Sequence, residues 1–220
     1  MMGKINGTED IRQLPPKVCQ MYKAVIQMLE EGMEACDIRV STITERAGIG
    51  KGTAYEYFDS KEEIVACAIL YQMKEIFGWL ETALEERGSF REQLSFLLTE
   101  VEKREQHKNC FLRFLHMMTD NSEFNRMLQK KMHTEAFASY LPMNVFAGVM
   151  SRGVEKGELR RDIPLDYMVH CLFSHLLIYM MSVASGGFFH TDPEVVRPLV
   201  YQGILNELEG ELSEDEAISK

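Results

Sequence analysis

The chain has 220 residues, is 45% hydrophobic and 26% charged, and carries a formal net charge of −10 at pH 7. This size and composition allow a buried core without disulfides, which argues against a disordered protein or a small disulfide scaffold. Its five scattered cysteines and the lack of an apolar N-terminal signal predict reduced thiols in a cytoplasmic protein.

The first elements follow from proline, glycine and apolar spacing. Residues 1–14 are polar and of mixed charge, so we expect a flexible arm. Pro15 and Pro16 start a helix, its buried stripe runs from Val18 to Leu29, and Gly32 ends it.

Residues 39–63 read RVSTITERAGIGKGTAYEYFDSKEE and contain the most informative pattern of the chain. Val40, Ile43 and Ala47 form one helical stripe, Gly48 ends that helix, and Gly50 opens a second one. The second helix exposes Lys51, Thr53 and Tyr55, which are hydrogen-bond donors with almost no apolar outer face. Two short helices joined by a glycine turn predict a helix-turn-helix that enters the major groove of DNA.

The stretch ERAGIGKGTAYEYFDSKEE closely resembles the DNA-binding signature of the TetR family of bacterial transcription regulators. At motif level the resemblance covers roughly residues 17–72. It implies base contacts from Lys51 and Thr53, with Gly52 allowing close approach to the groove wall. The phosphate contacts that it implies come from Ser41, Thr42, Tyr55, Tyr57 and Lys61, and packing is the open alternative for Tyr57.

Net charge alone does not point to DNA. Residues 1–61 hold eight Lys or Arg against nine Asp or Glu, so the DNA argument rests on where the cations lie. This balance predicts modest non-specific affinity.

Further helices follow in chain order, and no stretch alternates like a strand. Ser-x-x-Glu capping boxes at Ser60 and Ser89 start two of them. Pro142 must kink or divide a later one. The predicted helices span residues 60–86, 89 to beyond 101, 109–118, 164–186 and 192–210. One more begins after residue 122 and contains Pro142.

These elements predict an all-α protein of about nine helices, with a three-helix DNA-binding head and a larger helical body. The expected divisions are a flexible arm (1–14), a helix-turn-helix domain (15–60), a ligand-binding and dimerisation domain (61–210) and an acidic tail (211–220). Residues 167–191 contain no Asp, Glu, Lys or Arg, and this uncharged stretch is long enough to span a membrane. Their histidines, serines and glycine pair favour a helix buried in the core and a dimer interface, so we expect no membrane partner.

The body holds most of the fifteen methionines and many aromatic residues, which can line a pocket for a small apolar effector or simply pack the core. The family resemblance implies such an effector, and our candidate contacts are Trp79, Phe114, Met118, Tyr140, His175 and Tyr179. His170, His175 and His116 could line a metal or ligand site, but core packing is the simpler interpretation. We therefore predict no metal site and no cofactor.

The pattern as a whole predicts a ligand-responsive repressor that binds a near-palindromic operator in double-stranded DNA as a homodimer. Two alternatives stay open: an activator or effector-independent DNA binder, and a small helical enzyme. The sequence has no glycine-rich phosphate loop and no nucleophile–histidine pairing, so we predict no catalytic residues.

Overall fold

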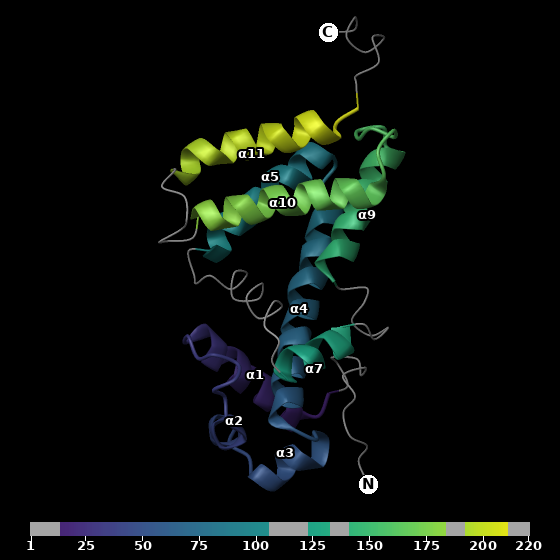
Figure 1. Cartoon of the computed structure of the whole chain (residues 1–220). Coiled ribbons are helices and arrows are strands. Elements are labelled where there is room, and N and C mark those ends of the chain that lie inside the picture. The colour runs from purple at the N-terminus through teal and green to yellow at the C-terminus, as the bar shows by residue number, and fades with distance from the viewer. Residues whose placement is uncertain (1–13, 106–122, 133–140, 184–191, 211–220) are drawn as a thin grey trace, which may run out of the picture. The chain divides into compact units, whose positions relative to one another are not determined.

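A computed structural model describes residues 14–105, 123–132, 141–183 and 192–210. All regular elements of these ranges are α-helices, nine in number, beside one isolated bridge between Leu159 and Glu209 (Figure 1). The predicted all-α class is confirmed. The helices are α1 (Pro16–Glu30), α2 (Val40–Arg46), α3 (Lys51–Tyr57), α4 (Lys61–Glu85), α5 (Phe90–Glu105), α7 (Glu123–Met132), α9 (Pro142–Glu155), α10 (Leu165–Val183) and α11 (Pro193–Leu208).

The described residues form two compact units, and α4 contributes to both. The first unit comprises residues 14–79, 123–132 and 141, and the second comprises 80–105, 142–183 and 192–210. The change of unit therefore falls within α4, between Trp79 and Leu80.

In the first unit, one apolar cluster joins α1, α2, α3, the first turns of α4, and α7. Val18 and Val25 of α1 and Ile64 of α4 are completely buried in it, as is Leu128 of α7. Burial of apolar surface stabilises this unit by about 25 cal/mol per Å². The short helices α2 and α3 depend on this core, because isolated helices of their length are not stable in water.

Both predicted capping boxes are present. At the start of α4, the Glu63 N–H donates to Ser60 Oγ (3.2 Å), and Glu63 Oε2 accepts from the Asp59 N–H (2.7 Å). At the start of α5, the Glu92 N–H donates to Ser89 Oγ at 3.3 Å. Its carboxylate accepts from the N–H groups of residues 88 and 89. These bonds fix both helix starts within the predicted segment.

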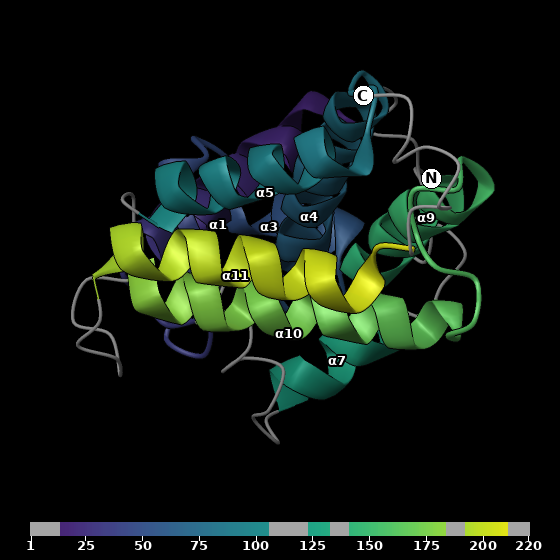
Figure 2. The same cartoon turned by 90° about the horizontal axis from the view of Figure 1, so that it is seen from above.

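The second unit is a layered helical bundle in which α10 packs against α5, α9 and α11, and α11 also packs against α5. Figure 2 shows α10 and α11 side by side along their length. Leu94, Leu98, Val149, Leu172 and Ile204 are completely buried between these helices.

The turn after α9 is closely packed. Gly157 has a φ of 76°, the left-handed region that favours glycine, and it returns the chain to α9. An added Cβ on Gly153 would lie 2.6 Å from Cδ1 of Leu159, which is itself buried. Glycine at position 153 is therefore required by close approach.

Several predicted boundaries can be compared with the structure. Pro142 begins α9, which agrees with the predicted division of that segment and not with a kink inside one helix. The uncharged segment forms α10 over Leu165–Val183. In the single chain Tyr167 and Ile178 are 49% and 45% exposed, on the part of the helix that the predicted dimer interface would have to cover. None of the helices in the described ranges combines the length and the apolar character of a membrane span. The predicted helix at 109–118, residues 1–13 of the predicted arm and the acidic tail lie outside the described residues.

Candidate nucleic-acid interface

A glycine turn sets the geometry between α2 and α3. Gly48 has a φ of 67°, and its N–H donates to the Glu45 carbonyl at 3.1 Å. The Ile49 N–H then donates to the Thr44 carbonyl at 2.9 Å. These two bonds satisfy the last carbonyls of α2 and turn the chain sharply. Gly50 follows in an extended conformation as the residue before α3.

The helix α3 has one anchored face and one exposed face. Ala54 is completely buried, and Tyr57 and Phe58 are 5% and 1% exposed in the core of the first unit. Lys51 lies on the exposed side, and Tyr55 is 52% exposed. The core thus holds the backbone of α3 while its donors face outward, which is the arrangement that groove reading requires.

The predicted DNA contacts fall into groups of different exposure. Lys51, Gly52 and Tyr55 are exposed, and Thr53 is half-buried. An added Cβ on Gly52 would meet nothing within 4 Å, so its backbone is open to close approach from outside. Ser41 and Thr42 are half-buried in the first turn of α2.

Tyr57 belongs to the core and not to the proposed contact surface. Because only 5% of it is exposed, packing is the alternative that the structure supports. Sequence spacing left both choices open, since a tyrosine at the end of a short helix can turn either way.

Lys61 has an internal partner that sequence reasoning missed. Its Nζ donates to the carbonyl of Cys36 at 2.7 Å and lies 3.7 Å from Glu62 Oε1. Lys61 therefore ties the start of α4 to the connection between α1 and α2. An ammonium group has three donors, so a phosphate contact would share the cation with this internal bond.

Of the two remaining cations in α2 and α3, Arg46 has an ion-pair partner and Lys51 differs from it. Arg46 at the end of α2 pairs with Glu31 at 2.7 Å, and this hydrogen bond raises the pKa of Arg46 above its usual value. Within the described residues, no salt bridge engages Lys51. Lys51 is thus the cation of α3, and its exposed charge has no partner ion in the part of the chain that the structure describes.

The candidate effector contacts are only partly brought together. Tyr179 is completely buried, and its hydroxyl donates to Glu102 of α5. Burial and this bond raise the pKa of Tyr179. His175 is half-buried on the same helix, whereas Trp79 is 45% exposed and belongs to the first unit. Phe114, Met118 and Tyr140 lie outside the described residues.

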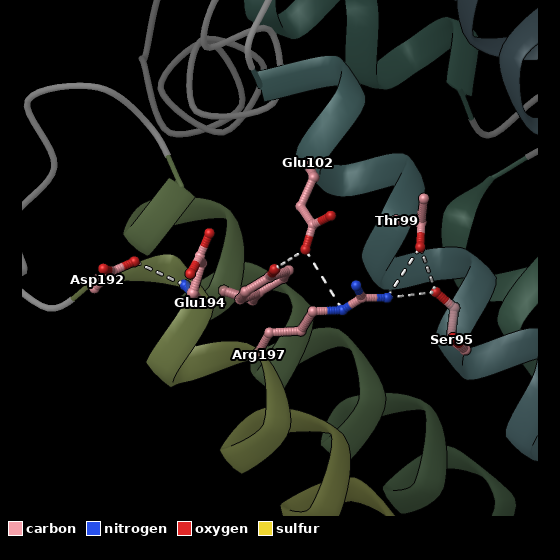
Figure 3. A network of polar contacts seen from close by, with 7 residues as sticks. Ser95, Thr99, Glu102, Asp192, Glu194 and Arg197 are labelled. Carbon is pink, nitrogen blue, oxygen red and sulfur yellow. Dashed lines mark hydrogen bonds and ion pairs between the residues drawn. The ribbon is translucent and has the colours of Figure 1, made fainter.

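A polar network surrounds Glu102 in the second unit (Figure 3). Arg197 of α11 lies 3.5 Å from Glu102, and it donates to Thr99 Oγ1 at 3.0 Å and to the Ser95 carbonyl at 3.3 Å. Tyr179 completes the network from α10. These bonds join α5, α10 and α11 and satisfy the polar tip of Tyr179, which composition alone could not reveal.

Comparison with known proteins agrees with this geometry. Residues 23–67 match the model of the tetR family of bacterial regulatory proteins. The chain is 25% identical over 166 residues to the fatty acid metabolism regulator protein of Bacillus subtilis (strain 168), covering 74% of this chain and 81% of that one.

Solved structures share the fold at lower sequence identity. The transcriptional regulator FadR of Bacillus subtilis in complex with stearoyl-CoA is 17% identical, with a TM-score of 0.64 over 85% of this chain and 97% of that one. The fatty acid degradation regulator FadR of Bacillus halodurans is 20% identical, with a TM-score of 0.65 over 88% and 96% of the two chains. A transcriptional regulator of Saccharomonospora viridis in complex with choline is 16% identical, with a TM-score of 0.65 over 88% and 98%. The helix-turn-helix and these matches agree: residues 23–67 match the tetR family of bacterial regulatory proteins, and the chain as a whole is similar in fold to the regulators named above.

Proposed function

We propose that the protein is a homodimeric repressor that binds a near-palindromic operator and is released by a long-chain acyl-CoA. The observation that carries the DNA-binding part is the geometry of α3: Ala54 fixes it in the core, while Lys51 and Tyr55 face outward. The donors Lys51 and Thr53 would reach base edges, and Tyr55, Ser41 and Thr42 would contact phosphates.

An exposed apolar face on α10 and α11 supports the homodimer. Tyr167 and Ile178 on one side of α10 and Val195 and Leu199 on one side of α11 are 45–67% exposed. Large apolar side chains gathered on adjacent helices are typical of an interface. A second copy would cover this face with the same two helices, so that four helices form the interface. To bind successive major grooves, the dimer must hold its two heads about 34 Å apart, one turn of DNA.

The relatives support an acyl-chain effector. One curated relative regulates fatty acid metabolism by name, and one structure of similar fold was solved with stearoyl-CoA. Another structure of similar fold was solved with choline, so choline serves as a comparison compound in the test of the effector.

Release of DNA would depend on a shift of α4. This continuous helix begins at Lys61, directly after the α3 segment, and its last turns belong to the second unit. An effector that shifts those turns would move the start of α4 and change the spacing of the heads. Thermodynamic linkage then requires that DNA weaken effector binding by the same factor.

The DNA-binding proposal is tested by selecting bound duplexes from a random pool and measuring affinity for the selected site. Lys51→Ala should weaken operator binding by about 5- to 150-fold, the range expected for loss of one good base contact at about 1–3 kcal/mol. Binding to random duplex should change much less. Lys130→Ala on α7 removes the same charge from an exposed lysine and serves as the control. Equal losses on operator and random DNA would show that Lys51 reads no base.

The effector proposal is tested by adding stearoyl-CoA, free stearate, CoA or choline to the protein–operator complex and following fluorescence anisotropy. Release by stearoyl-CoA alone supports the proposal. Release by stearate would assign the acyl chain without CoA, and release by choline would replace the effector class. Retention of DNA with every compound would favour the effector-independent alternative, and transcription in vitro would then separate repression from activation.

Equilibrium sedimentation tests the dimer at micromolar concentration. Leu199→Glu, which places a charge where 67% of the leucine is exposed, should shift the protein toward monomer. Gln129→Glu on α7 adds the same charge at another exposed position and should leave the dimer intact. A wild-type monomer would contradict the proposal.

A further inference from the structure

Three metal-binding side chains meet between α10 and α11. Cys171 and His175 lie four residues apart on one face of α10, and Glu207 approaches them from α11. One ligand atom from each lies within 4.8 Å of the others. Cys171 is buried, and the other two are half-buried.

The two distances from the sulfur to its neighbours are close to those of a tetrahedral site. The sulfur of Cys171 lies 3.7 Å from His175 Nδ1 and 3.2 Å from Glu207 Oε2. Zinc binds sulfur at about 2.3 Å and nitrogen or oxygen at about 2.0 Å, so tetrahedral angles separate its sulfur from either neighbour by about 3.5 Å. Both observed distances lie close to that value, so the sulfur needs little displacement from either neighbour to receive a cation.

Neighbouring groups hold two of the ligands in place. The hydroxyl of Tyr167 donates to Glu207 Oε1, which leaves Oε2 facing the sulfur. An added Cβ on Gly203 would lie 3.2 Å from His175 Nε2, so the absence of a side chain there lets the imidazole lie against α11. Outer partners of this kind orient metal ligands in known sites.

We propose that Cys171, His175 and Glu207 form a binding site for a divalent cation of the zinc class, with a fourth position open to water. Sulfur, imidazole and carboxylate together are a ligand set that zinc accepts. Cys171 binds as the thiolate, and its proton passes to solvent. His175 Nδ1 lies 2.9 Å from the Cys171 carbonyl, so coordination through it uses the tautomer with the proton on Nε2 and a rotation away from that carbonyl. The cation then links α10 to α11 directly.

Cobalt(II) provides a direct probe, because its bond to a thiolate gives a charge-transfer band in the near ultraviolet. Full-length protein, cleared of metal by a chelator, is titrated with Co²⁺ and then with competing Zn²⁺. We expect a saturable band in the wild type that Zn²⁺ removes at one equivalent per chain. Cys171→Ser should abolish the band, whereas Cys36→Ser, at an exposed cysteine, should leave it unchanged.

If Cys171→Ser does not fold, variants of the half-buried Glu207 and His175 still test the proposal. Glu207→Gln and His175→Gln should each weaken Zn²⁺ binding at least tenfold, since loss of even an outer partner costs about 10- to 100-fold. Tyr167→Phe should weaken it by a similar factor while helical circular dichroism stays unchanged. Absence of a saturable band in the wild type, or equal affinity in the Glu207 and His175 variants, would overturn the proposal. These readouts do not use DNA, so they stand apart from the regulator function.

Discussion

A buried ion pair joins α7 to the first turn of α4. Nζ of Lys131 lies 2.9 Å from Oε1 of Glu63, and the two side chains are 10% and 13% exposed. The other oxygen of Glu63 accepts from the Asp59 N–H at 2.7 Å. If the cation is removed, this carboxylate stays largely shielded from water with only part of its charge compensated.

Replacing Lys131 with Met should therefore destabilise the protein markedly. Breaking a buried pair by removing one partner costs about 3–5 kcal/mol. The Asp59 bond and the positive N-terminal end of α4 still stabilise the carboxylate, so we expect about 3 kcal/mol, the lower end of that range. Lys130→Met removes an exposed lysine from the same helix and should change stability by less than about 0.5 kcal/mol.

Urea unfolding followed by helical circular dichroism measures these differences. All variants are compared at one protein concentration, because the stability of a dimer depends on concentration. Adding Glu63→Gln to Lys131→Met should recover about 1–2 kcal/mol, since it removes the unpaired charge and keeps an oxygen for Asp59. The reasoning fails if Lys131→Met resembles Lys130→Met, or if the added Glu63→Gln destabilises the protein further.

Two other predictions concern packing and thiol reactivity. Gly153→Ala should cost about 1–3 kcal/mol in thermal or urea unfolding, because its Cβ would lie 2.6 Å from buried Leu159. Gly148→Ala on the same helix meets only the end of an arginine side chain at 3.3 Å, and it should be neutral or stabilising by up to about 1 kcal/mol; equal losses would contradict this account. Burial raises the pKa of Cys67 from 9.0 to about 11, so at pH 8 its thiolate fraction falls about 100-fold. A thiol reagent followed by mass spectrometry should therefore modify exposed Cys36 at least about 100 times faster than Cys67 in the folded protein, and similar rates would refute this.

Local signals predicted much of the fold. The caps at Ser60 and Ser89, the turn at Gly48 and the prolines at helix starts act within a few residues, so sequence shows them directly. The two exposed residues Lys51 and Tyr55 followed from the same periodicity, because helical spacing fixes which side faces the core.

What the sequence did not reveal depends on distant partners. Lys61 bonds to a carbonyl 25 residues earlier, and Glu207 meets Cys171 across 36 residues and two helices. Spacing within one segment cannot show such pairs. For that reason nothing in the sequence indicated the cluster of Cys171, His175 and Glu207, since the cysteines carry no paired-ligand motif. For α10, the lack of charge did predict a helix that lies partly in a dimer interface, and that interface stays a prediction.

The internal use of cations in the head affects how the protein searches for its site. Arg46 is paired with Glu31, and Lys61 is bound to the Cys36 carbonyl, so neither charge is fully available to phosphates. Non-specific affinity comes from neutralised phosphates and counterion release, and each contact adds about 0.9 to the steepness of the salt dependence. With these two cations engaged internally, the head would release fewer counterions on DNA than its sequence suggests. We therefore expect faster dissociation from unrelated DNA and shorter sliding along it than if both charges were free.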